Sequence, residues 1–268
     1  MRFLDLNMLE LGEVGGQTQP GLSAFQNGKW VHGQKAFSIC RQDPQSVRFN
    51  VWENLNLDPL GLPGGMRHLA DLAVGQLQTV CKDLSRDMWT VYTPVHWDKA
   101  QLQDFLGVAQ ACKMDVRALL PRVLAANGDP ASREIEWQWS RRLYADLDVA
   151  AEGLHIQSFG IDPEGGVLDL FRKHARAVAQ WALETHRLDP LYSGASEQKL
   201  FEGWWTWQQG RGGWRFQSAE LDLDFSELLH LEIAKTPMIS SLNSVEARLG
   251  DLSQPGARWK EFLPVAEG

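Results

Sequence analysis

Long apolar runs and metal-binding motifs are both missing from this sequence. No run of about 18 apolar residues occurs, so no transmembrane helix is expected. The first residues, MRFLDLNMLELGEV, mix acids into an apolar stretch and are unlike a signal peptide. The three cysteines lie far apart and the seven histidines form no His-x-x-x-His pair, so neither a disulfide framework nor a zinc site is expected. These absences favour a cytoplasmic protein whose thiols lie in the core.

An excess of positive charge is also missing. Lysine and arginine total 26 against 34 acidic residues, which gives a net charge of −8. Nucleic-acid binding normally needs a basic surface, so no nucleic-acid partner is expected. The 268 residues are 44% hydrophobic, which is enough for one large folded domain or two small ones.

Helical and strand patterns alternate along the chain. An Asn27-Gly28 turn between two strand-like stretches predicts a hairpin, and Asp98 with Gln101 predicts the start of a helix. Strands are predicted over 2–11, 22–25, 88–95, 114–116, 134–139, 141–149, 153–159 and 214–223. Helices are predicted over 65–84, 98–113, 117–126, 167–188, 195–209, 226–234 and 240–249. The order of strands followed by helices occurs twice, and residues 127–130 (NGDP) interrupt it, so two α/β lobes are predicted, 1–128 and 129–268.

Tryptophan is unusually frequent, with twelve residues. Six of them cluster in the second half: Trp137, Trp139, Trp204, Trp205, Trp207 and Trp214. Packing in the core is favoured over an exposed binding patch, because surface tryptophan is costly unless it is used. An exposed patch would instead indicate a sugar- or peptide-binding module.

Three groups of stretches, in this order, are similar to motifs of one superfamily. They are 20–36 with 43–45, then 89–97 with 99–116, and last 196–200 with 219–228. The sequence resembles the nucleotide-binding domain of DnaK-type heat-shock chaperones, within the actin/hexokinase/heat-shock ATPase superfamily. The resemblance implies a two-lobed actin-like ATPase-domain fold with mixed sheets, covering most of the chain.

The resemblance also implies where a nucleotide would bind. In this family two hairpins hold ATP, their backbone N–H groups cradle the phosphates, and their acids coordinate Mg²⁺ through water. The residues at matching positions are Asp5 and Asn7 in the first hairpin, and Glu197 and Lys199 on the helix that meets the ribose and adenine. For Asp5, a solvent-facing acid at a strand end is favoured over a Mg²⁺ contact. For Glu197 and Lys199, a solvated helix face is the favoured alternative.

The departures from the family pattern concern catalysis. Asn7 replaces the first hairpin's glycine, and the second hairpin, over 134–142, has no glycine. Trp52 lies where the family has its catalytic lysine, and residues 254–258 offer no Gly-Gly-Ser loop, so the fold is expected to be shortened at this end. No catalytic residue and no metal ligand are therefore predicted, and ATP with Mg²⁺ is the only cofactor implied.

Other polar residues have two interpretations each. Arg141 and Arg142 are either an anion site or a solvated surface pair, and the surface pair is favoured. His96 is interpreted as a packing histidine. Asp222 and Asp224 share one strand face, as a carboxylate pair or, by preference, as a solvent-facing edge.

Three functions are weighed from these observations. The leading hypothesis is a non-hydrolysing actin- or heat-shock-like domain that binds another protein. The alternative is a working ATP-binding ATPase or kinase domain of the same fold with an altered phosphate site. The third is the sugar- or peptide-binding module. The oligomeric state stays open.

Overall fold

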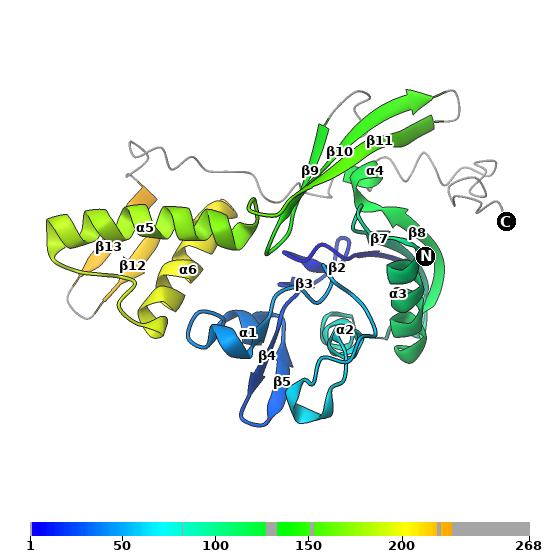
Figure 1. Cartoon of the computed structure of the whole chain (residues 1–268), viewed down its shortest axis with the longest axis horizontal. Coiled ribbons are helices and arrows are strands. Elements are labelled where there is room, and N and C mark those ends of the chain that lie inside the picture. The colour runs from blue at the N-terminus through cyan, green and yellow to red at the C-terminus, as the bar shows by residue number, and fades with distance from the viewer. Residues whose placement is uncertain (1, 82, 127–132, 151–152, 219–220, 227–268) are drawn as a thin grey trace.

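The computed structural model describes residues 2–81, 83–126, 133–150, 153–218 and 221–226 of the chain. In this part, helices and four β-sheets follow one another, so the mixed α/β class is confirmed. Figure 1 shows the first half of the chain around one central sheet, and the second half as a strand layer with a helical group beside it. None of the described helices is long and apolar enough to cross a membrane.

The central sheet has the strand order β3-β2-β1-β7-β8. The first three strands form an antiparallel meander, whereas β7 and β8 run parallel to β1. β7 has the sequence MWTVYT and is buried after its first residue, because strands lie on both sides of it. The strands are β1 (Arg2–Asp5), β2 (Leu11–Glu13), β3 (Thr18–Gln19), β7 (Met88–Thr93) and β8 (Asp115–Pro121).

Helices α2 (Leu69–Val80) and α3 (Lys99–Ala111) pack against this sheet and against each other. α3 supplies the crossover that parallel strands β7 and β8 require. It begins as predicted, because the Asp98 carboxylate accepts the backbone N–H of Gln101 at 2.9 Å.

A small three-stranded sheet, with α1 beside it, lies at the lower end of Figure 1. The predicted hairpin is confirmed, and its turn residues Asn27 and Gly28 have φ values of 52° and 76°. Positive φ at both positions is what a type I′ turn requires. The elements here are β4 (Ser23–Gln26), β5 (Lys29–His32), α1 (Gln34–Phe37), β6 (Val47–Arg48) and the 3₁₀ turns Pro44–Ser46 and Pro63–Gly65.

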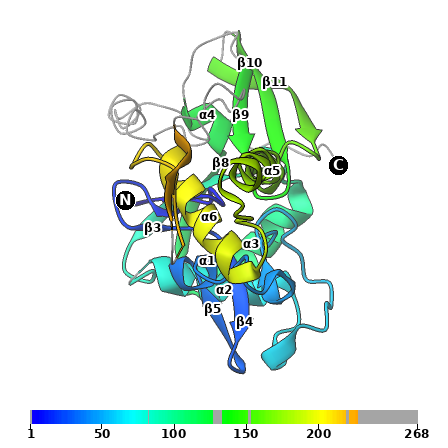
Figure 2. The same cartoon turned by 90° about the vertical axis from the view of Figure 1, so that its left-hand side faces the viewer.

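The second half begins with another antiparallel meander, in the order β11-β10-β9. Figures 1 and 2 both place this sheet above the rest of the described chain. A helix pair and a short hairpin follow. The elements are α4 (Arg122–Ala126), β9 (Arg133–Trp137), β10 (Arg142–Ala150), β11 (Gly153–Asp162), α5 (Val167–His186), α6 (Gly194–Gln208), β12 (Arg215–Gln217) and β13 (Asp222–Asp224).

One large apolar core joins the two halves and contains the clustered tryptophans. All six are at most 8% exposed. α5 and α6 pack through Phe171, whose ring centroid lies 4.8 Å from that of Phe201 and 5.4 Å from that of Trp204. The packing interpretation is confirmed, so these six residues do not form the exposed patch that a sugar- or peptide-binding module needs.

Some predicted elements are wrong because a turn or a strand was hidden in an apolar stretch. The strand expected over 2–11 is β1 and β2 with a turn between them, and the strand expected over 214–223 is the β12–β13 hairpin. The first half of the helix expected over 117–126 belongs to β8, which pairs with β7, and the second half is helix α4.

Two further predictions concern residues at the edge of what the structure describes. The helices expected over 226–234 and 240–249, apart from Ser226, lie outside the described residues, and so does the lobe boundary at 127–130. The division into lobes 1–128 and 129–268 stays a prediction.

Candidate functional site

The two hairpins that open the halves of the chain meet at their loops. Residues 6–10 connect β1 to β2, and residues 138–141 connect β9 to β10. The indole Nε1 of Trp139 donates a hydrogen bond to the backbone oxygen of Met8 over 2.9 Å, and both residues are buried. The two loops that match the family's phosphate-binding hairpins in the resemblance are therefore in direct contact.

The first loop is shaped by its own side chains. The Asp5 carboxylate accepts the backbone N–H of Asn7 at 3.1 Å, and the Asn7 side-chain oxygen accepts the N–H of Leu9 at 3.1 Å. Asparagine and aspartate favour turns through such bonds. Asn7 thus shapes a buried turn, which explains why the apolar stretch over 2–11 does not continue as one strand.

Aromatic rings surround Trp139, which is fully buried. Its ring centroid lies 5.3 Å from that of Trp205, 5.6 Å from that of Phe49 and 6.4 Å from that of Phe37. These rings come from α6, from the loop after β6 and from α1. The second hairpin loop therefore places a large apolar side chain, held by both halves, against the first loop.

A buried arginine lies beside the acids of both hairpins. Arg122, at the start of α4, donates from Nε to the Asp5 carboxylate over 3.0 Å, and each side chain is 5% exposed. Glu136 on β9 is 3% exposed and interacts electrostatically with both residues. Burial raises the pKa of Asp5 and of Glu136, and the attraction of Arg122 opposes part of each rise. The positive charge of the Arg122 guanidinium therefore stabilises two buried carboxyl groups, those of Asp5 and Glu136.

The hydrogen bonding around this group is incomplete. Three buried atoms have no partner among the described residues: Tyr92 Oη, Arg122 Nη2 and Glu136 Oε2. Buried groups without partners lower the stability of a fold. Such costs concentrate at functional sites, and this group therefore marks the junction of the hairpins as the candidate site.

A second set of bonds ties the loop 138–141 to the first half. The Glu53 carboxylate accepts the Ser140 backbone N–H at 3.0 Å and also bonds the Ser140 hydroxyl. Arg141 Nη2 donates to the Glu53 backbone oxygen at 2.6 Å and lies 2.7 Å from His96 Nε2. Burial lowers the pKa of His96 to about 4, so the ring is neutral at physiological pH. These residues attach the second loop to the first half of the chain.

Ser140→Ala tests how much this attachment contributes. The change leaves one oxygen of the 1%-exposed Glu53 without its hydroxyl donor. We expect the free energy of unfolding, measured by urea denaturation, to fall by about 1–3 kcal/mol. The matched control is Ser158→Ala, which removes an exposed 2.8 Å bond to Asp146 and should change it by less than about 0.5 kcal/mol. Equal losses in the two variants would contradict the assignment.

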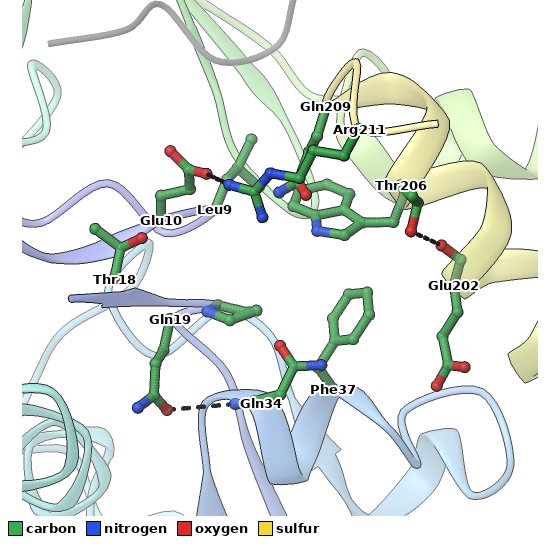
Figure 3. Close-up of a pocket in the computed structure, with 12 residues that line it drawn as sticks. Leu9, Glu10, Thr18, Gln19, Gln34, Phe37, Glu202, Thr206, Gln209 and Arg211 are labelled. Carbon is green, nitrogen blue, oxygen red and sulfur yellow. Dashed lines mark hydrogen bonds and ion pairs between the residues drawn. The ribbon is translucent and has the colours of Figure 1, made fainter. Parts of the chain in front are cut away.

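A pocket of about 320 Å³ lies beside the first hairpin loop. Figure 3 shows Glu10 and Arg211 reaching toward each other on one side, as a 3.5 Å ion pair, and Gln19 accepting the Gln34 backbone N–H at 3.4 Å on the other. Aromatic residues of α1 and α6 complete the walls. Amide, charged and aromatic groups of this kind suit a small polar molecule.

The residues predicted to contact a nucleotide are divided between two places. Asp5 and Asn7 lie together in the first loop, and the interpretation of Asp5 as a solvent-facing acid is wrong, because it is 3% exposed and paired with a buried arginine. Glu197 forms an ion pair with Arg41, whose Nε lies 2.9 Å from its carboxylate. Lys199 is exposed on α6, as expected for a solvated helix face. In the described part of the chain, neither α6 residue is bonded to the first loop.

Two other interpretations are corrected or confirmed. Arg141 is not part of a solvated surface pair, because it bonds Gln138 and Glu53. Arg142 is half-exposed and forms a 2.7 Å ion pair with Asp162. His96 is a half-buried packing histidine, as predicted.

The aspartates at the end of the described chain also have a clear outcome. Asp222 and Asp224 are both exposed on β13, which confirms the solvent-facing edge. Asp224 lies 3.6 Å from Arg215 on the paired strand.

Sequence reasoning missed the residues that define the site. Arg122 was assigned to an ordinary helix, and Glu136 only to an alternating strand. The alternation of Glu134, Glu136 and Gln138 in EIEWQW did place these polar side chains on one face, which is a signal for a polar face turned inward. Nothing local identifies Arg122, which lies 117 residues from its partner.

Within the described ranges, no group of three or more His, Cys, Asp or Glu side chains is placed to hold a metal ion. No protein-family model matches the chain, and no curated protein matches its sequence. The function is therefore argued from the geometry of the junction.

Proposed function

We propose that this chain is a catalytically degenerate actin- and heat-shock-like domain that acts as a protein-binding or assembly module with little or no ATP hydrolysis. Each half begins with a three-stranded antiparallel meander, and the first hairpin loops of the two meanders meet. This arrangement supports a two-lobed actin-like fold, because the resemblance puts ATP between two such hairpins.

The residues that lie between the two hairpin loops are the main support for this proposal. The family that the sequence resembles cradles phosphates with N–H groups of glycine-rich loops and places Mg²⁺ beside hairpin acids. Here Trp139 packs against the first loop, and Arg122 supplies the positive charge beside Asp5. An indole in the place of glycine blocks access of a phosphate, and a buried ion pair leaves the carboxylate unavailable to a metal.

Thermal unfolding with and without nucleotide tests the proposal. A ligand at 100 times its Kd stabilises the folded state by about 2.7 kcal/mol, which raises the melting temperature by several degrees. Because we propose that no nucleotide binds, we expect millimolar ATP or ADP with Mg²⁺ to leave the melting temperature unchanged within about 1 °C. The matching activity assay should show no saturable ATP turnover. Either a shift of several degrees or saturable turnover would contradict the proposal.

One observation favours the alternative, an ATP-binding domain with an altered phosphate site. The pocket of about 320 Å³ adjoins the first hairpin loop and is lined by Arg211. On this alternative, Mg²⁺-ATP raises the melting temperature, Arg211→Ala removes the rise, and Arg86→Ala, at an exposed arginine outside the pocket lining, leaves it intact. Both side chains are exposed, so neither change should prevent folding.

We further propose that the module works in the cytoplasm with a protein partner and without nucleic acid. The net charge of −8 supports the absence of a nucleic-acid partner, and the three cysteines are free and buried. Exposed apolar side chains on the β9–β11 sheet support a protein partner. They are Ile135, Val149, Phe159 and Ile161, each 44–52% exposed.

A further inference from the structure

Strand β11 is an edge strand among the described residues, and it has few of the features that normally protect an edge. Its ten residues, GLHIQSFGID, contain no lysine, arginine, glutamate or proline. Among the described residues, β10 pairs with one side of β11 and no strand pairs with the other. Natural proteins guard such edges with charges or proline, because an open row of N–H and C=O groups pairs with another strand. Within the part of the chain that the structure describes, the edge of β11 is therefore open to pairing.

The apolar side chains of β11 continue the buried face of the sheet. Phe159 lies opposite Ala145 and Ile161 lies opposite Leu143, and both partners are fully buried on β10. Cross-strand partners share a face. Phe159 and Ile161 are nevertheless 51% and 44% exposed, because no strand lies beyond them in the described chain. An added strand would cover them.

A β-bulge at Gln157 changes the alternation along β11. Ser158 pairs with Asp146 and Ile156 pairs with Leu147, which leaves Gln157 without a partner in the register. The apolar face therefore uses even residue numbers before the bulge, at Leu154 and Ile156, and odd numbers after it, at 159 and 161.

We propose that two copies of this chain pair antiparallel through β11, about a two-fold axis between Gln157 and Ser158. This register puts Leu154 opposite Ile161 of the second copy, and Ile156 opposite its Phe159. All four positions face the same side, because the bulge has shifted the alternation by one residue. An axis through Gln157 or through Ser158 would instead put these apolar positions opposite polar residues or glycines.

The charges of the strand fit the same pairing. His155 and Asp162 are the ionisable residues of β11, and the register puts them opposite Gly160 and Gly153 of the second copy. No like charges meet, which removes the usual barrier to self-pairing. A bulge twists an isolated edge away from a straight partner, but here both bulges lie at the axis and bend the two strands alike.

The expected dimer is weak. A single strand pair buries less than the roughly 800 Å² per partner of a standard interface, so we expect a Kd of about 10 µM. This inference rests on the proposed function, because it names a second copy of the chain as a partner of the assembly module. Its test is nevertheless separate from the test of that function. Nucleotide binding reports on the hairpin junction, whereas self-association reports on β11.

Sedimentation velocity of the full chain between about 1 and 100 µM tests the dimer. We expect a monomer–dimer equilibrium that Phe159→Lys weakens at least tenfold. The matched control is Ile135→Lys, a similarly exposed position on β9, at the other edge of the same sheet. It should leave the Kd within about twofold. Circular dichroism of both variants verifies that they fold.

Cross-linking tests the register. Leu154→Cys and Ile161→Cys chains are prepared separately and mixed under mild oxidation; the three native cysteines are buried. The mixture should form a disulfide-linked dimer, because opposite Cβ atoms lie about 5 Å apart. Each variant alone should not, because its two thiols would lie about 24 Å apart, seven residues along the strand.

Three results would overturn the inference. One is a wild-type chain that stays monomeric at the highest concentration, which would leave the edge to a strand of another protein. Another is an equal weakening by Ile135→Lys and Phe159→Lys. The third is a mixture of the cysteine variants that cross-links no better than either variant alone.

Discussion

Arg122→Met is expected to lower the free energy of unfolding by about 3–5 kcal/mol, because methionine leaves the buried carboxyl groups of Asp5 and Glu136 without their counter-charge. Arginine and methionine have similar apolar stems, so packing changes contribute less than the lost charge. Urea denaturation at neutral pH measures the loss. The loss is large because breaking one partner of a buried ion pair costs more than the pair contributes.

The loss should also depend on pH, with a definite sign. Burial already raises the pKa of Asp5 and of Glu136 above their unfolded values of about 3.9 and 4.3, and removing Arg122 raises both further. A raised folded pKa favours the fold below the unfolded pKa, and that advantage is lost as pH rises through the folded pKa. The difference between wild type and variant should therefore grow as pH rises above the raised pKa values of the two carboxyl groups in the folded wild type.

Two comparisons make this result specific. Burial lowers the pKa of His96 and His174 to about 4 in the wild type, and both residues remain in the variant, so their effect cancels in the difference. Arg142→Met breaks a half-exposed ion pair with Asp162 and should cost less than about 1 kcal/mol. A loss in Arg122→Met that stays constant with pH, or one matched by Arg142→Met, would show that Arg122 does not balance the buried acids.

The second large effect is expected for Trp139→Ala. The change removes a fully buried indole, its contacts with three aromatic rings and its hydrogen bond to Met8, and we expect a loss of about 3–5 kcal/mol in the free energy of unfolding. The matched control is Trp30→Ala. Its indole also donates to a backbone oxygen, that of Pro63 at 2.9 Å, but it is only half-buried.

The comparison between the two tryptophans separates the junction from ordinary packing. Trp30→Ala should cost less than half as much, because part of that ring already contacts water. If both variants lose the same free energy, Trp139 is one core tryptophan among several and the proposed role of the junction is wrong. Thermal unfolding with a second probe, near-ultraviolet circular dichroism, checks that each variant remains native before the transition.

Local signals in the sequence were sufficient for several elements. The Asn27-Gly28 turn and the Asp98 cap depend on residues within three positions of each other, so a short stretch of sequence is enough to predict them. β8 was predicted only at its start, by the strand expected over 114–116, for the opposite reason. Its sequence also fits a helix, and pairing with β7, which is 27 residues away in the sequence, decides in favour of a strand.

The candidate site was only half predictable for the same reason. The hairpin residues Asp5 and Asn7 were identified through the resemblance, and the loop over 138–141 falls inside the predicted second hairpin. The partner of Asp5 comes from 117 residues away, and that of Trp139 from 131 residues away. No periodicity or spacing reports contacts over such separations, so the burial of these groups emerges only from the folded chain.

The hydrogen bond between Trp139 and Met8, which joins the two hairpin loops, has a consequence for regulation. A two-lobed protein that a small molecule opens and closes changes conformation with each round of ligand binding and release. Here the contacts between the two loops are made by the chain's own residues, and they form whenever the chain folds. On the proposed function, nucleotide binding has no step at which it could open this junction, so the amount of the protein would set its activity.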